Sequence, residues 1–158
     1  MKAKLSRRAN AALMVLFLCG TLFVAAGTGA EEASAQERQA QMAQNQFLYE
    51  DVYFKADSTE LLPSSKGLLD RKVDWLKAHP DPLVVIEGHC DARGSSAFNM
   101  RLGDARAGKI KTYLVQKGIQ ASRLLAISYG EEDPVDSGQG EEAWSKNRRV
   151  RFVIPEAF

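Results

Sequence analysis

The chain has 158 residues, enough for one domain and some additional sequence, and its 45% hydrophobic and 26% charged residues are typical of a globular protein. The net charge is +1, but Lys2, Lys4, Arg7 and Arg8 carry all the charge of the first thirty residues, which leaves the remainder weakly acidic. Nucleic-acid binding requires a basic face, so we expect no nucleic-acid partner.

The first 35 residues have the layout of a secretory signal peptide. A short basic stretch precedes an apolar run at residues 11–26, and small residues follow. Cleavage after Ala30 or after Ala35 fits this layout, and the "ASA" sequence favours the second site. The apolar run has about 16 residues, just short of a membrane span, so an uncleaved anchor is the alternative. We expect contact with a membrane only through this segment.

Cys19 lies inside the apolar run. Lipidation of Cys19 would anchor the protein, but Leu18 occupies the preceding position, where bacterial lipoprotein signals carry a small residue. The other interpretation is that Cys19 is one more apolar residue of the run. If the signal is removed, Cys90 is the one remaining cysteine and no internal disulfide can form.

Residues 31–46 are rich in Ala, Gln and Glu and predict a short polar tether or a frayed helix. We therefore divide the chain into a signal segment at 1–35, a tether at 36–46 and a folded domain at 47–158. Aromatic and β-branched residues at 47–54 predict the first strand. Helix-start signals at residues 63–65 precede a helical apolar spacing at 66–79, which Pro80 ends.

The second half of the domain alternates in the same way. We expect a strand at 82–89, a helix from Ser96 to Gly118, a strand at 123–130, a loop rich in Gly, Asp and Glu, and a strand at 148–154. The β-α-β-α-β-β order predicts an α/β (α+β) sandwich, a mixed four-stranded sheet with helices on one face. The expected apolar face of the second helix consists of Phe98, Leu102, Ala105, Ile110, Tyr113 and Leu114.

The stretch "EGHCDARGSSAFNMRLGDARA" at residues 87–107 carries the candidate chemistry. His89, Cys90 and Asp91 contain the residue types of a cysteine nucleophile, but neighbours in a strand point to alternate faces and no distant base is evident. His89 with Cys90 also lacks the ligand spacing of a zinc site. We therefore expect no enzyme, no metal and no cofactor, with Cys90 a half-buried apolar residue. An envelope hydrolase that uses Cys90 is the catalytic alternative.

Ligand binding fits this stretch better. Asp91 follows a strand and precedes a helix N-terminus, and Arg106 lies about three turns into that helix. A carboxylate and a guanidinium held apart would suit a zwitterion. The alternative is a plain Asp91–Arg106 salt bridge.

The segments "VYFKADSTEL", "EGHCDARGSSAFNMRLGDARA", "ISYGEEDP" and "SKNRRVRFVI" resemble the OmpA-like peptidoglycan-binding domain, most closely its peptidoglycan-associated lipoprotein (Pal) branch, over residues 49–154. The resemblance implies a βαβαββ domain that binds the meso-diaminopimelate of the peptidoglycan stem peptide without covalent chemistry. It assigns the ligand ammonium to Asp91 and the ligand carboxylate to Arg106. Further positions that match the family's pocket are Phe54, Ala56, Asp57, His89, Asn99, Leu102, Asn147 and Arg148.

The same resemblance predicts a periplasmic, outer-membrane-associated protein that tethers the cell wall to the outer envelope of a Gram-negative cell. The alternative is an interaction protein of the Tol-Pal type that docks a TolB-like periplasmic partner. The sequence departs from the family pattern at Ala105, where an arginine often precedes Arg106, and at Leu18. Gly88 could be structural or lie beside the pocket, and we expect Arg149 to point to solvent.

Overall fold

The structure is a computed structural model that describes residues 31–47 and 49–155. The described residues fall into two units, one that ends at Met42 and one that begins at Ala43, and residues 31–47 are helical. The predicted signal segment up to Ala30, including Cys19, lies outside the described residues. Among the helices that are described, none has the length and apolar character needed to cross a membrane.

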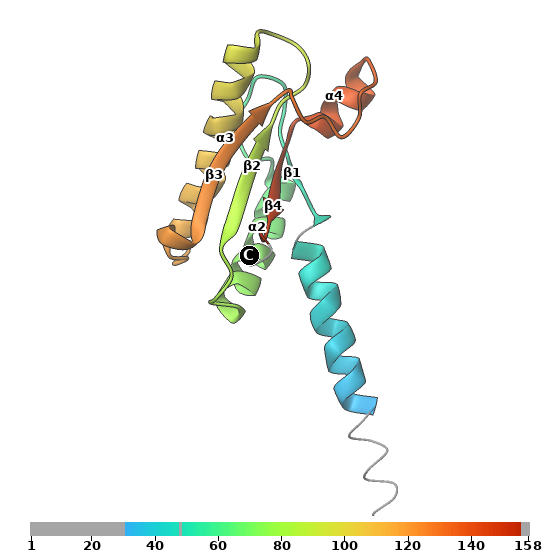
Figure 1. Ribbon diagram of the computed structural model, residues 1–158, viewed down its shortest axis with the longest axis vertical. Coiled ribbons are helices and arrows are strands. Elements are labelled where there is room, and N and C mark those ends of the chain that lie inside the picture. Colours follow the sequence, from blue (N-terminus) through green and yellow to red (C-terminus); the bar gives the residue numbers. More distant parts are fainter. Residues whose placement is uncertain (1–30, 48, 156–158) are drawn as a thin grey trace, which may run out of the picture. The chain divides into compact units, whose positions relative to one another are not determined.

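The second unit contains a four-stranded mixed sheet, as predicted. Its elements are β1 (Val52–Tyr53), α2 (Pro63–Ala78), β2 (Val84–His89), α3 (Ser96–Gln116), the 3-10 helix η1 (Ala121–Arg123), β3 (Leu124–Gly130), α4 (Glu141–Asn147) and β4 (Arg149–Val153). The strand order is β1-β4-β2-β3, with β2 and β3 parallel and β4 antiparallel to both of its neighbours. In Figure 1, α2 and α3 lie behind the sheet, and α3 packs mainly on β2 and β3.

Two predicted elements differ from the structure. The strand expected at 47–54 is limited to Val52–Tyr53, because Phe47 belongs to the preceding helix and stacks on Trp75 at 4.3 Å between ring centres. Its aromatic side chain packs in the core although the residue lies near the end of a helix. The aromatic and β-branched composition of residues 47–54 does not reveal this. The loop expected between the last two strands contains α4, whose seven residues are too few to give a helical periodicity.

The buried face of α3 is offset from the prediction. Phe98 is 39% exposed and Ala105 is exposed, whereas the buried residues are Asn99, Gly103, Arg106, Ala107, Ile110 and Leu114. Periodicity of apolar residues missed this face because its first half carries polar residues and a glycine. Those residues face the end of β2, where the candidate site lies.

Glycines bring α3 unusually close to β2. A Cβ atom added to Gly88 would lie 2.0 Å from the backbone oxygen of Gly103, and one added to Gly103 would lie 2.8 Å from the oxygen of Gly88. This contact sets the distance between α3 and the sheet close to the site. Gly88 lies three residues before Asp91, and Gly103 lies three residues before Arg106. The close contact with Gly103 therefore explains why a glycine is needed at position 88, in line with the structural one of its two expected roles.

Candidate functional site

Asp91 lies just beyond the end of β2 and is only 6% exposed. Its carboxylate accepts hydrogen bonds from the backbone N–H of Arg93 at 3.2 Å, from Arg93 Nε at 3.1 Å and from Arg93 Nη2 at 2.7 Å. Arg148 Nη1 adds a fourth at 3.1 Å. Burial acts to raise the pKa of Asp91, but the hydrogen bonds from Arg93 and Arg148 outweigh it and lower that pKa. Asp91 is therefore a buried, ionised carboxylate.

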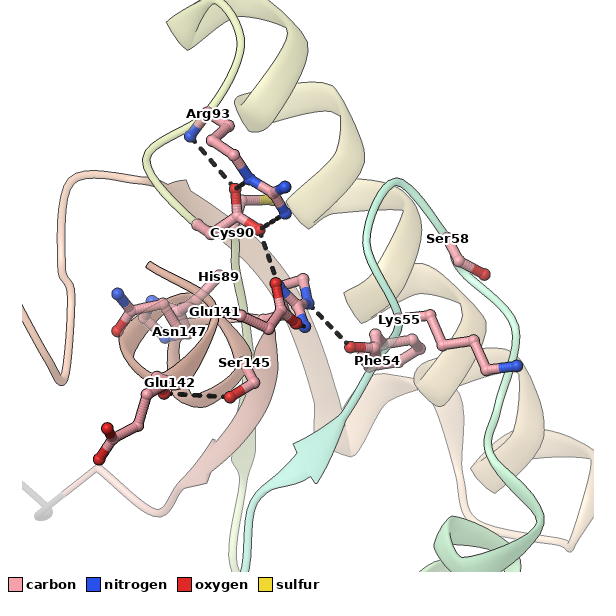
Figure 2. A network of polar contacts seen from close by, with 12 residues as sticks. Phe54, Lys55, Ser58, His89, Cys90, Arg93, Glu141, Glu142, Ser145 and Asn147 are labelled. Carbon is pink, nitrogen blue, oxygen red and sulfur yellow. Dashed lines mark hydrogen bonds and ion pairs between the residues drawn. The ribbon is translucent and has the colours of Figure 1, made fainter. Parts of the chain in front are cut away.

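Arg148 joins three segments around this carboxylate. It follows α4 directly, its side chain is 6% exposed, and its Nε donates to the Phe54 carbonyl at 3.2 Å. Its Nη2 donates to Glu141 at the start of α4. Figure 2 shows this network, with Arg93, Glu141 and Phe54 contributed by three separate parts of the chain. Arg148 is thus held by contacts with Phe54, Asp91 and Glu141.

Arg106 is fully buried and is held by backbone carbonyls. Its Nε donates to the carbonyl of Ser58 at 3.0 Å, Nη1 to that of His89 at 2.8 Å and Nη2 to that of Lys55 at 3.0 Å. These bonds tie the loop after β1 to the end of β2. Burial lowers the pKa of Arg106 but leaves it a cation. Asp91 forms its ion pairs with Arg93 and Arg148, so the plain Asp91–Arg106 salt bridge is not the arrangement observed.

Asn99 organises the turn that carries Asp91. The residue lies in the first turn of α3 and is 2% exposed. Its Nδ2 donates to the carbonyl of Arg93 at 2.9 Å and to that of Asp91 at 3.3 Å. The hydroxyl of Ser95 caps the same helix by accepting from the Phe98 N–H. The turn is therefore fixed by side chains of α3 and by its cap.

The other predicted residues divide between the site and the surrounding structure. Phe54 is buried, with the Arg106 guanidinium 5.2 Å from its ring centre. Ala56 and Asp57 are exposed in the loop after β1, and Leu102 is half-buried on α3. Asn147 is buried and holds the loop before α4 through bonds to the backbone of Val135 and Asp136.

His89 contributes its backbone rather than its ring to this region. The carbonyl accepts from Arg106, while the ring stacks on Tyr129 and lies 3.9 Å from carboxylate oxygens of Glu87 and Asp133. Burial and the nearby Arg149 lower the pKa of His89 to about 4. The ring is therefore neutral at pH 7 and belongs to a different side-chain group from Asp91.

The expectation that Arg149 points to solvent is wrong. Its side chain is 1% exposed and forms ion pairs with Asp51 at 3.4 Å and Asp133 at 3.6 Å. Arg149 starts β4, and its side chain joins the group around His89 instead of entering water. Consecutive arginines in "NRRV" thus have two different buried environments, one at Asp91 and one at Asp51 and Asp133.

Cys90 lacks the environment of a nucleophile. It is 3% exposed, its Sγ donates to the Asn99 carbonyl at 3.3 Å, and burial raises its pKa to about 11. The reactive form of cysteine is the thiolate, which this environment disfavours. Cys90 is also more deeply buried than expected. Within the described part of the chain, no three His, Cys, Asp or Glu side chains are grouped to hold a metal ion.

Three residues around Asp91 were missed by the sequence reasoning: Arg93, Glu141 and Trp144. Arg93 lies two residues after Asp91, and its guanidinium lies 4.4 Å from the ring centre of Trp144. An open hollow of about 440 Å³ borders Arg148 and is lined by Tyr53, Phe54, Lys55, Leu62, Ser145, Lys146 and Arg148. The sequence could have indicated Arg93, because it lies two residues after Asp91. It contained no signal for Glu141 and Trp144, because α4 itself was not predicted.

Comparisons with known proteins agree with this architecture. Residues 53–148 match the model of the OmpA family. A peptidoglycan-associated lipoprotein of Pseudomonas putida is 42% identical over 127 residues, which cover 80% of this chain and 73% of that protein. One of Rhizobium meliloti is 39% identical over 103 residues, covering 65% of this chain and 58% of that protein.

A solved structure extends the likeness to three dimensions. The crystal structure of the peptidoglycan-associated lipoprotein from Burkholderia pseudomallei is similar with a TM-score of 0.65 at 35% identity, covering 66% of this chain and 89% of that one. The names of these relatives describe association with peptidoglycan. The chain belongs to the OmpA family, and its relatives there include peptidoglycan-associated lipoproteins.

Proposed function

We propose that the domain binds peptidoglycan without chemical change and thereby tethers the cell wall to the cell envelope. The observation that carries this proposal is Asp91, a buried and ionised carboxylate at the surface end of β2 among the cations Arg93, Arg106 and Arg148. A carboxylate surrounded by guanidinium groups complements a ligand that carries both an ammonium and carboxylates. The names of the relatives point to peptidoglycan as the source of such a ligand.

The specific group that we propose is the meso-diaminopimelate of the stem peptide. Its ammonium would pair with Asp91, and a carboxylate at the same end would meet Arg106. Three N–H groups of Arg106 already bind carbonyls and a fourth donates to Cys90 Sγ at 3.5 Å, so the ligand would use the one remaining N–H group or displace the loop at residues 55–58. Phe54 and the loop after β1 would form one wall of this subsite.

Pull-down on isolated sacculi tests the proposal. We expect the protein to co-sediment with meso-diaminopimelate sacculi and the Asp91→Asn variant, which keeps the shape and removes the charge, to remain in the supernatant. Asp104→Asn, an exposed position on α3, is the matched control and should bind like the wild type. Unchanged binding by Asp91→Asn, with its circular dichroism native, would rule out this pocket.

Two finer expectations come from the resemblance and stay predictions. The first is a periplasmic, outer-membrane-associated location, which depends on the N-terminal segment. The second is docking of a TolB-like periplasmic partner as an alternative to peptidoglycan. Competition between a purified TolB-like protein and sacculi would test the second: displacement supports a shared surface, and simultaneous binding contradicts it.

A further inference from the structure

The carboxylate that should receive a ligand ammonium is already occupied. Arg93 supplies three of the four hydrogen bonds to Asp91, two of them from its guanidinium. Arg148 supplies the fourth. An ammonium that entered with both arginines in place would put three cations around one buried carboxylate, and repulsion between like charges would oppose it. Ligand binding through an ammonium therefore favours movement of one of the arginines.

The two arginines differ in how firmly they are held. The Arg148 side chain is 6% exposed and also donates to the Phe54 carbonyl and to Glu141. The Arg93 side chain is 44% exposed; apart from Asp91 it lies 4.4 Å from the ring centre of Trp144 and interacts electrostatically with the exposed carboxylates of Glu141 and Asp57. A stack of guanidinium on indole at an exposed site contributes little free energy, on the order of 1 kcal/mol. Arg93 is therefore the cation that can leave.

We propose that Arg93 is a built-in competitor that occupies the ammonium subsite at Asp91 and must be displaced by the ligand, with Trp144 of α4 supporting it in the occupied position. This inference rests on the proposed function and adds a specificity-determining residue to it. A ligand must bring a cation that outcompetes the guanidinium, so a neutral peptide of the same shape is rejected. The competitor also keeps Asp91 paired while the site is unliganded.

The side chain of Arg93 can be removed without dismantling the turn. The backbone N–H of Arg93 donates to Asp91, and the carbonyl of Arg93 accepts from Asn99, so both contacts survive in Arg93→Ala. Arg148 still pairs with the carboxylate. We therefore expect this variant to fold, and Arg71→Ala is the matched control because Arg71 is an exposed arginine paired with Glu50 on another part of the domain.

The test is calorimetric titration with the soluble tripeptide L-Ala-γ-D-Glu-meso-diaminopimelate. We expect Arg93→Ala to bind it about 3- to 10-fold more tightly than the wild type, which corresponds to loss of one partly exposed competing ion pair. Arg93→Lys should lie in between, because lysine keeps the charge but not the paired donors. Arg71→Ala should bind like the wild type. Equal or weaker binding by Arg93→Ala would overturn the proposal, and weaker binding would make Arg93 a ligand contact.

A second readout follows the displacement directly. The chain has two tryptophans, Trp144 beneath Arg93 and Trp75 on α2, so the indole N–H signals provide a probe and an internal control in one NMR spectrum. The Trp144 signal should shift on ligand addition in the wild type and shift much less in Arg93→Ala, while Trp75 stays in place. An unmoved Trp144 signal in a saturated wild type would contradict displacement.

The two proposals fail in different ways. If Asp91→Asn binds the tripeptide as well as the wild type does, the proposed pocket is wrong whatever Arg93 does. If Asp91→Asn loses binding but Arg93→Ala gains none, the pocket stands and the competitor is wrong. If Arg93→Ala binds the tripeptide and the wild type does not, the result supports Arg93 as a competitor. If neither protein binds it, both the pocket proposal and the competitor proposal are overturned.

Discussion

Substitution of Gly88 by alanine should cost the domain much of its stability. The added Cβ would lie 2.0 Å from the carbonyl oxygen of Gly103 and 2.6 Å from its carbonyl carbon, far inside contact distance. The obstacle is the backbone of α3, so no side chain can rotate away, and the helix must move by about 1 Å or more to relieve the overlap. Overpacking of this kind lowers the free energy of unfolding by about 1–3 kcal/mol. Because the overlap here is with backbone atoms, we expect a loss of about 3 kcal/mol or more.

Urea denaturation of Gly88→Ala measures this loss, and the melting temperature should fall by roughly 10–20 °C for a domain of this size. Gly108→Ala, on the same helix with nothing within 4 Å of its added Cβ, is the control and should raise the free energy of unfolding by about 0.5–1 kcal/mol. Since α3 also carries Asn99 and Arg106, Gly88→Ala should weaken ligand binding. If the free energy of unfolding of Gly88→Ala lies within about 0.5 kcal/mol of the wild-type value, the predicted overlap with α3 is refuted, because an ordinary surface substitution has an effect of that size.

Three buried groups lead to further predictions. His89 has its pKa lowered to about 4 by burial, so the unfolded chain binds its proton first and stability should fall by at most about 3 kcal/mol from pH 6.5 to pH 4. Burial raises the pKa values of Asp51 and Glu87 nearby, which acts in the opposite direction. The test is therefore a comparison by urea denaturation: between pH 6.5 and pH 4, His89→Asn should lose less stability than the wild type. Lys72 has its pKa lowered to about 8 by burial, so stability should rise between pH 8 and pH 10.5, by up to about 3 kcal/mol, and Lys72→Met should abolish this rise. Cys90, in a Cys19→Ser chain, should react with a thiol reagent at pH 8 far more slowly in buffer than in urea; equal rates would contradict a buried thiol of pKa about 11.

Periodicity predicted the elements that form the frame of the domain. Pro63 and the apolar spacing after it predicted α2, and the apolar run before His89 predicted β2. The buried face of α3 could not be found in this way, because Asn99, Gly103 and Arg106 are buried for contacts with the end of β2 and the loop after β1. Hydrophobicity is a poor guide where polar side chains are buried to make specific hydrogen bonds.

The candidate site was predicted in part. Asp91 was proposed from its place between a strand and a helix and Arg106 from its place about three turns into that helix, and the resemblance assigned their roles. The resemblance placed Arg148 at the pocket, but its ion pair with Asp91 could not be predicted, because Arg148 lies 57 residues further along the chain and reaches Asp91 only through the pairing of β4 with β2. Arg93 was close in sequence, but its support by Trp144 depends on α4, which had no sequence signal.

Titration of the protein with the meso-diaminopimelate tripeptide and with its L-lysine counterpart tests the central claim most directly. Both ligands carry an ammonium at the end of the third side chain, but only the first carries a carboxylate beside it. We expect the protein to bind the first ligand, to bind the second at least about tenfold more weakly, and to lose binding of both in Asp91→Asn. Equal affinity for the two ligands, or undiminished affinity in Asp91→Asn, would contradict recognition of a zwitterion at Asp91.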